Sequence, residues 1–347
     1  MNTPVYVVVP ADIDDPAVPS GGNAYDRRVC RELAAAGRAV HEIAVSGAWP
    51  RPGPAARASL AGELAAVPDG AAVVLDGLVG CGVPDIVVPQ ADRLALVVLV
   101  HLPLGEENAS LAAAERDVLH AVDAVVATSP WTARRLIAAH GLDAGRVHVA
   151  TPGVDPSPLA GGSGGSRLLC VGSISPTKGQ DLLVEALVAV ADEQWSCDLV
   201  GAVRRDPAHV AAVREAIARH GLGDRVQVTG PLVGDALEAV FAAADLLVLP
   251  SRVEAYGMVV TEALARGIPV LAAAAGGVPE TLGDSGLLVP PGDAAALATA
   301  LGRWFGEPDM RDGLRRAAAL RRPELDGWEV TARCLGQVLD SRCGTRV

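Results

Sequence analysis

The chain has 347 residues, 50% of them hydrophobic, and a formal net charge of −12. A chain of this length fits two domains, each able to fill a core of its own. The acidic balance argues against binding to nucleic acids or to anionic membranes, because both require clustered Lys and Arg.

The first half of the chain alternates between predicted strands and helices. Val5–Pro10 is a continuous apolar run, which is typical of a strand buried on both faces of a parallel sheet. Further strands are predicted at residues 40–44, 71–76, 94–101, 124–128 and 147–150, and helices at residues 25–36, 109–121 and 130–140. This alternation indicates right-handed βαβ units around a parallel sheet.

The alternation stops after residue 155 and then starts again. Residues 156–166 are rich in Pro, Gly and Ser, so we expect a linker there. Strands are then predicted at residues 167–172, 197–200, 226–229, 246–250, 269–273 and 287–289, and helices at residues 179–191, 209–220, 236–243, 259–266, 294–304 and 327–339. We therefore expect two doubly wound α/β domains, at residues 1–155 and 167–325, followed by a terminal helix within residues 326–347. Ligands of open parallel sheets bind at the carboxyl ends of the strands, so a site is expected in a cleft between the two sheets.

Residues 250–267 carry the clearest chemical signal. Glu254 and Gly257 lie in a loop after a predicted strand, and a helix that starts near Met258 carries Glu262. Free N–H groups at a helix start can bind an anion such as a diphosphate, and a glycine lets the backbone approach it. Glu254 can accept hydrogen bonds from sugar hydroxyls, and Glu262, about 6–7 Å farther along the axis, can bind a ribose. The alternative is structural, with Glu254 as a helix cap and Glu262 in a surface ion pair.

Lys178 is the only lysine of the chain and lies in the turn PTKG before a predicted helix. A cation is unfavourable at the start of a helix dipole, so a bound anion explains its position better. There it would complement a diphosphate and the charge that grows on a leaving group. The alternative is a lysine placed by chance in a surface turn.

The spacing of Glu254 and Glu262, E-x7-E, resembles the signature of the retaining GT-B glycosyltransferases of family 4. Other stretches resemble motifs of that family in the same order: SGG at 20–22, PGVD at 152–155, VGSISPTKG at 171–179 and GGVPETLGDSGLLVPPGD at 276–293. DGWEVTARCLGQVL is similar to the family's last helix, which crosses back to the N-terminal domain. The resemblance covers nearly the whole chain and implies two Rossmann-like domains that face a central cleft.

The resemblance also implies roles for individual residues. Glu254, Lys178 and His101 are the expected catalytic residues. The expected donor-binding residues are Gly21, Gly22, Ser173, Lys178, Leu232, Glu254, Tyr256, Gly257, Met258, Val259 and Glu262. Gly21 and Gly22 are similar to the family's glycine loop, although a flexible turn would look the same. His101 ends a predicted strand, where the family has a histidine facing the donor sugar, and its alternative role is structural.

One position departs from the family pattern. The family usually has an Arg directly after the glycine of VGSISPTKG, where this chain has Ser173. A second cation for the donor must then come from elsewhere, for instance Arg252 or Arg204, or backbone amides hold the donor instead.

No metal site and no cofactor are predicted. Asp12-Ile13-Asp14 is formally a DxD metal motif, but it lies in an acidic loop of the first domain, where a solvated surface explains it. The six cysteines have neither CxxC nor zinc spacing, and we expect reduced thiols. There is no predicted membrane span and no signal peptide, so a cytoplasmic protein is expected.

The resemblance implies a hexosyltransferase that moves a sugar from a nucleotide diphosphate sugar, with UDP the commonest nucleotide in the family. The acceptor is expected to be a hydroxyl of a small soluble molecule, and the acidic N-terminal domain would suit an amine-bearing natural product. Two alternatives stay open: a nucleotide-sugar epimerase on the same fold, and a non-catalytic partner that binds nucleotide sugars. A phosphorylase is less favoured, because Lys178 lies in the wrong motif for a pyridoxal phosphate lysine.

Overall fold

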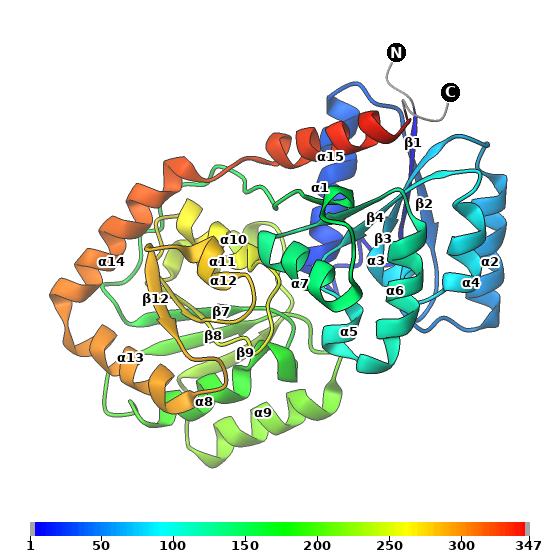
Figure 1. The fold of residues 1–347 in the computed structure, drawn as a ribbon. Coiled ribbons are helices and arrows are strands. Elements are labelled where there is room, and N and C mark those ends of the chain that lie inside the picture. The colour runs from blue at the N-terminus through cyan, green and yellow to red at the C-terminus, as the bar shows by residue number, and fades with distance from the viewer. Residues whose placement is uncertain (1–3, 344–347) are drawn as a thin grey trace. The chain divides into compact units, whose positions relative to one another are not determined.

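The computed structural model describes residues 4–343, and the chain divides into two compact units. The described residues of the first unit are 4–14, 21–153 and 327–343, and those of the second are 15–20 and 154–326. Each unit is built on one parallel sheet with helices in the connections (Figure 1). The predicted pair of parallel-sheet α/β units is confirmed.

The sheet of the first unit has the strand order β2-β1-β3-β4-β5-β6, and all neighbouring strands are parallel. The strands are β1 (Val5–Pro10), β2 (Val40–Val45), β3 (Ala72–Asp76), β4 (Ala95–Val100), β5 (Ala124–Ala127) and β6 (Val147–Val149). Every residue of β3 and β4 is buried, as expected of central strands that are covered on both faces.

Seven helices connect these strands: α1 (Gly21–Ala35), α2 (Pro54–Ala66), α3 (Gly77–Gly80), α4 (Pro84–Val87), α5 (Leu104–Glu107), α6 (Ala112–Ala121) and α7 (Pro130–His140). Helix α7 illustrates how sequence sets the boundaries. The side chain of Ser129 caps its start, Pro130 occupies the first position, and Gly141 ends it with φ +68°.

Helix α15 (Trp328–Cys343) belongs to this first unit and lies beside α1 (Figure 1). The ring of Trp328 meets that of Tyr25 edge-on, with centroids 5.6 Å apart. The hydroxyl of Thr331 donates to the carbonyl of Thr151 at 2.7 Å. Helix α15 therefore packs as part of the first unit.

The sheet of the second unit has the order β12-β11-β10-β7-β8-β9, again with parallel neighbours. The strands are β7 (Arg167–Val171), β8 (Ser196–Val200), β9 (Val226–Gly230), β10 (Leu246–Leu249), β11 (Val270–Ala273) and β12 (Gly286–Val289). The helices are α8 (Gln180–Val188), α9 (Pro207–Arg219), α10 (Asp235–Ala243), α11 (Met258–Ala265), α12 (Val278–Leu282), α13 (Ala294–Gly306) and α14 (Pro308–Arg321).

The helices differ from the prediction at several places, and the short helices α3, α4, α5 and α12 were not predicted. Helix α1 starts at Gly21, so Gly21 and Gly22 lie in the first turn of a helix and not in a loop. Helices α2 and α14 were not predicted at all. Each buries only two side chains, four residues apart, so the apolar stripe that marks a helix is very narrow in both.

Candidate functional site

Helix α11 of the second unit starts without a side-chain cap. A loop of residues 250–257 leads from β10 into the helix, and Gly257 has φ +85°, a conformation that L side chains rarely adopt. Among the described residues, no side chain caps the helix, and its first turn contains no acidic residue. The N–H of Val260 donates to the carbonyl of Gly257 at 2.8 Å, and an anion can bind the N–H groups that precede it.

Lys178 and Glu254 form an ion pair next to this helix start. Nζ of Lys178 lies 2.6 Å from Oε2 of Glu254, and the side chains are 29% and 13% exposed. The hydroxyl of Ser251 donates to the same oxygen at 3.3 Å. The two residues are far apart in sequence, but β7 and β10, the strands that precede them, are neighbours in the sheet. The predicted cation and the predicted sugar-binding acid thus contact each other directly.

Two glycines let the loops around Glu254 come together. A Cβ atom at Gly276 would lie 1.8 Å from the carbonyl oxygen of Glu254, which accepts a hydrogen bond from the N–H of Gly277 at 2.9 Å. A Cβ atom at Gly179 would lie 2.2 Å from the carbonyl oxygen of Pro250. Both contacts involve backbone, so a side chain at either position must displace the loop that carries Glu254.

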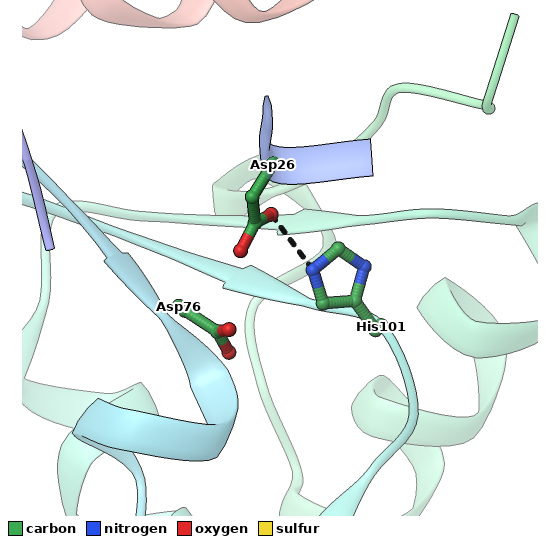
Figure 2. A group of neighbouring side chains, drawn as sticks. All are labelled: Asp26, Asp76 and His101. Atoms are coloured by element: carbon green, nitrogen blue, oxygen red, sulfur yellow. Dashed lines mark hydrogen bonds and ion pairs between the residues drawn. The ribbon is translucent and has the colours of Figure 1, made fainter. Parts of the chain in front are cut away.

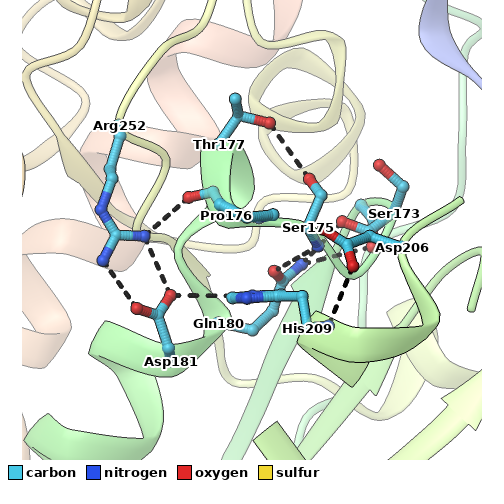
Figure 3. Close-up of polar contacts among 10 residues, drawn as sticks. Ser173, Ser175, Pro176, Thr177, Gln180, Asp181, Asp206, His209 and Arg252 are labelled. Carbon is cyan, nitrogen blue, oxygen red and sulfur yellow. Dashed lines mark hydrogen bonds and ion pairs between the residues drawn. The ribbon is translucent and has the colours of Figure 1, made fainter. Parts of the chain in front are cut away.

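Arg252, in the loop of residues 250–257, forms an ion pair with the carboxylate of Asp181 (Figure 3). Its terminal nitrogens lie 2.9 and 2.6 Å from the two carboxylate oxygens of Asp181, and one of them donates to the carbonyl of Pro176 at 2.6 Å. Burial raises the pKa of Asp181, but the hydrogen bonds from Arg252 outweigh it, so the pKa lies below its ordinary value. Arg252 is therefore engaged in holding the turn before α8 and is not a free cation for a donor.

Ser173 and Arg204 lie in the loops that follow β7 and β8. The carbonyl of Ser173 accepts a hydrogen bond from the side chain of Gln180 at 3.1 Å, as Figure 3 shows. Arg204 is exposed and forms no ion pair with any residue in the described part of the chain. Of the two arginines considered from the sequence, it is the one whose charge is available.

Glu262 lies in the second turn of α11 and is partly buried. Burial raises the pKa of its carboxyl, Arg266 opposes this shift, and Glu238 and Asp155 add to it. The carboxylate accepts no hydrogen bond from residues 4–343, although the backbone carbonyl of Glu262 accepts one from Arg266 at 2.7 Å. A half-buried acid without a protein donor is well suited to a ligand hydroxyl.

The other predicted donor residues of this unit, Tyr256, Met258, Val259 and Leu232, are all partly buried. Leu232 and Val259 pack against one apolar cluster. Burial raises the pKa of Tyr256 to about 12, so its hydroxyl stays protonated at neutral pH.

In the first unit, the predicted residues Gly22 and His101 touch each other. His101 directly follows β4, and a Cβ atom at Gly22 would lie 3.1 Å from Cδ2 of its ring. A glycine at the start of α1 therefore leaves space for the imidazole ring. The expected approach of Gly21 and Gly22 to the donor stays a prediction.

His101 belongs to a group with two buried acids, Asp26 of α1 and Asp76 at the end of β3 (Figure 2). Nε2 of His101 lies 2.8 Å from Oδ1 of Asp26, and polar atoms of all three side chains lie within 4.8 Å of one another. Asp26 and Asp76 are only 2% and 3% exposed. Asp26 was not predicted as a catalytic residue, because no local pattern links an acid on a helix to a histidine many residues later.

The three groups shift the pKa values of one another. Burial lowers the pKa of His101, but Asp26 and then Asp76 outweigh it and raise the pKa to about 9. Burial and then the negative charge of Asp26 raise the pKa of Asp76 to about 8. Both shifts favour the protonated form of the side chain concerned.

Oxygen and imidazole groups gathered in this way can also hold a metal ion. The ring nitrogen of His101 that faces the carboxylates is hydrogen-bonded to Asp26, and the expectation of no metal stays a prediction. In the acidic loop, Asp14 is paired with Arg27 at 2.6 Å.

Among residues 4–343, no helix combines the length and the apolar character needed to cross a membrane.

Two protein families match the chain one after the other. The family described as Glycosyltransferase Family 4 matches residues 19–158, and the family described as Glycosyl transferases group 1 matches residues 165–306.

Similar curated proteins carry the name D-inositol 3-phosphate glycosyltransferase. The protein from Thermomonospora curvata is 35% identical over 244 residues, which are 62% of this chain and 56% of that protein. The one from Salinispora tropica is 33% identical over 283 residues, 73% of this chain and 58% of that protein. The matched part of this chain thus spans less than two thirds of these relatives.

Solved structures with the same fold cover nearly the whole chain. Sucrose-phosphate synthase from Thermosynechococcus elongatus has a TM-score of 0.80 at 23% identity, covering 98% of this chain and 99% of that one. HepE from Anabaena, in complex with UDP-glucose, has a TM-score of 0.80 at 19% identity, covering 98% of this chain and 100% of that one. At these identities the similarity concerns the fold.

Proposed function

Because this chain belongs to glycosyltransferase family 4 and has the GT-B fold, we propose that it transfers a sugar from a nucleotide diphosphate sugar to an acceptor hydroxyl, with retention of anomeric configuration. The observation that carries the proposal is the uncapped start of α11, which lies between Glu254 and Glu262. The N–H groups of this helix start can bind a diphosphate. Glu254 on one side can bind hydroxyls of the transferred sugar, and Glu262 on the other side can bind hydroxyls of the ribose.

In this reaction the acceptor oxygen attacks the anomeric carbon from the face that the diphosphate leaves. The bond from this carbon to the phosphate oxygen breaks as the bond to the acceptor oxygen forms, and the departing phosphate takes the acceptor's proton. This route requires no protein nucleophile. The protein contributes the positioning of the two substrates and the stabilisation of the leaving group.

The contacts in the second unit support a role for each of the residues. Lys178 and the N–H groups of α11 bind the diphosphate, and Glu254 binds hydroxyls of the transferred sugar. Their ion pair keeps the lysine side chain in position before the donor arrives. Arg204, in the loop after β8, is the second cation that we expect to replace the family's arginine at position 173.

We propose UDP as the nucleotide, supported by the solved HepE complex with UDP-glucose and by its frequency in the family. Two acceptor classes deserve the first tests. The names of the relatives point to a phosphorylated polyol such as D-inositol 3-phosphate. The net charge of −12 favours instead an amine-bearing natural product.

The first experiment is thermal unfolding with UDP, GDP, dTDP and ADP and their sugars, each with and without EDTA. A ligand at about 100 times its Kd adds about 2.7 kcal/mol to the free energy of unfolding, which is a shift of a few degrees. We expect a selective shift with uridine nucleotides that EDTA does not change. If no saturating nucleotide shifts the transition, the proposal is wrong.

Ser173 supports a second candidate, a non-catalytic protein that binds nucleotide sugars, because the usual arginine of the donor site is missing there. Incubation with the preferred sugar nucleotide and an acceptor panel separates the two candidates. Transfer, with an α-linked product from an α-linked donor by NMR, supports the enzyme. Binding without transfer or hydrolysis supports the second candidate, and interconversion of the sugar without acceptor indicates an epimerase.

A further inference from the structure

Lys178 and Glu254 both lie in segments that the sheet of the second unit does not hold in place. The last residues at which β7 and β10 pair with each other are Leu169 and Leu247, well before the lysine and the acid along the chain. Parallel strands bring the two segments to the same edge of the sheet, because the carboxyl ends of the strands meet there. The position of the lysine relative to the acid is therefore set by contacts between the two segments themselves.

Arg252 joins the two segments at three points. Its backbone N–H donates to the carbonyl of Thr177 at 2.8 Å. Its guanidinium donates to the carbonyl of Pro176 at 2.6 Å and binds both carboxylate oxygens of Asp181, at 2.9 and 2.6 Å (Figure 3). Both carbonyls belong to residues directly before the lysine, and Arg252 stands two residues before Glu254. A planar guanidinium that binds both oxygens of an acid holds its partners in one geometry.

The side chain of Gln180 holds the earlier part of the same turn. Its amide nitrogen donates to the carbonyl of Ser173 at 3.1 Å and to that of Gly172 at 3.4 Å. Its amide oxygen accepts the N–H of Ser175 at 3.4 Å, and the residue is fully buried. The turn is thus fixed from inside the second unit as far as Ser175, and Arg252 holds its last part, next to the lysine.

The ion pair of Asp181 and Arg252 lies at the surface. The two side chains are 39% and 35% exposed, so their ion pair contributes little to the free energy of unfolding. His209 of α9 is a second neighbour of Asp181, but its Nε2 lies 3.9 Å from Oδ1 and has no hydrogen-bond partner in the described part of the chain. Arg252 is therefore the residue that links Asp181 to the loop of Glu254, and this link sets a position more than it adds stability.

We propose that Arg252 and Asp181 are positioning residues: their ion pair holds the turn of residues 176–178 against the loop of residues 250–254, so that Lys178 and Glu254 are in contact before a donor binds. Neither of the two residues is expected to touch the donor, and both act through the placement of the lysine beside the acid. The effect on turnover rests on the proposed function. The joining of the two segments does not, and it can be measured in the ligand-free protein.

Hydrogen exchange of the full chain, followed by mass spectrometry, tests the joining of the segments without any ligand. In Arg252→Gln, we expect faster exchange in the peptides that cover residues 173–180 and 250–257. The pattern elsewhere should stay unchanged, and the thermal transition should stay close to that of the natural chain, because an exposed ion pair adds little stability. Asp181→Asn removes the other partner and should give the same local result.

Arg303→Gln is the matched control. Arg303 also contacts both carboxylate oxygens of an acid, Glu307, at 3.0 and 3.1 Å, but both residues are exposed and lie at the end of α13. Its loss should leave the exchange of residues 173–180 and 250–257 as it is in the natural chain. The inference is wrong if Arg252→Gln also leaves these two segments unchanged. It is equally wrong if exchange rises throughout the second unit, since the ion pair would then support the fold in general.

Turnover gives the second readout. With UDP-glucose and an acceptor that the natural chain uses, we expect Arg252→Gln and Asp181→Asn each to lower kcat about tenfold and to weaken UDP binding less than Lys178→Ala does. Because Glu254 keeps its contact with the N–H of Gly277, Arg252 acts through the lysine, and adding Arg252→Gln to Lys178→Ala should lower kcat little further. A further loss of about tenfold in that double variant would mean that Arg252 acts on the donor directly, which contradicts the inference. If the natural chain neither binds UDP nor transfers a sugar, the proposed function fails, while hydrogen exchange still decides whether Arg252 and Asp181 join the two segments.

Discussion

At the scale of single residues, the contact between Lys178 and Glu254 determines what a substitution at either position does. In Glu254→Gln the ion pair is lost, and Lys178 is left free to bind phosphate. Turnover should fall about a hundredfold, because the sugar loses its acid, whereas bare UDP should bind equally well or more tightly. Steady-state kinetics together with calorimetric UDP titration check this.

Lys178→Ala should act differently and weaken both UDP binding and turnover, and Lys178→Arg should restore part of each. If Glu254→Gln loses UDP affinity as Lys178→Ala does, Glu254 binds the nucleotide and the assigned roles are wrong.

Gly276 gives a second prediction at this scale. In Gly276→Ala the new methyl group collides with the carbonyl of Glu254, so the loop must move and we expect at least a tenfold loss of turnover. Gly283→Ala is the matched control, since Gly283 has a similar φ of +54° but no atom within 4 Å of the added Cβ. The control isolates the cost of the backbone conformation, and equal effects of both variants on turnover would contradict the positioning argument.

At the scale of elements, the last helix is a test of how the first unit is held together. Trp328 of α15 is 5% exposed and packs on Tyr25 of α1. Trp328→Ala should lower the free energy of unfolding by about 3–5 kcal/mol in urea denaturation. Leu320→Ala on α14 is the control, because Leu320 is 74% exposed and its loss should cost less than about 0.5 kcal/mol. A small effect of Trp328→Ala would mean that α15 does not stabilise this unit.

Also at this scale, the sequence predicted the strands well and some of the helices poorly. Runs such as residues 95–100 are apolar throughout because both faces of a central parallel strand are covered, and this leaves a strong signal. Helix α2 buries only Leu60 and Leu64, and α14 only Leu314 and Ala318, so their patterns are close to those of polar loops. The start of α1 was missed because two glycines are poor helix formers.

The candidate site could be predicted only where its signal is local. Glu254, Gly257 and Glu262 lie within one loop and one helix, so their spacing is visible in the sequence. The bond from Lys178 to Glu254 depends on β7 lying beside β10, a strand order that the sequence does not reveal. The pairing of Asp26 with His101 likewise depends on how α1 packs against the end of β4.

At the scale of the whole molecule, the buried group in the first unit should make stability depend on pH. The pKa of His101 is about 9 in the folded chain and about 6.5 in the unfolded chain, so protonation of this side chain stabilises the fold. This contribution is complete below about pH 6.5 and is lost as the pH rises through 9. The raised pKa of Asp76, about 8, has the same sign, because the folded chain keeps a proton that the unfolded chain releases near pH 4. The free energy of unfolding should therefore fall from about pH 4, where the contribution of Asp76 begins to be lost, to pH 9.

Urea denaturation at several pH values measures this slope. The double variant with Asp76→Asn and His101→Gln should show a shallower fall over the same range, since neither new side chain titrates there. An identical slope in the variant and the natural chain would assign the pH dependence to other groups.

The contact of the single lysine with Glu254 also makes this protein convenient for covalent footprinting. Apart from the α-amino group, Lys178 is the only primary amine that an acylating reagent can modify, and 29% of its side chain is accessible. One added acyl group, assigned by mass spectrometry to the peptide that carries Lys178, therefore reports on the donor site without mutation or isotope. Protection by UDP would follow occupancy of that site directly, and any acceptor that changes the rate of labelling in the presence of UDP would be identified from the same spectra.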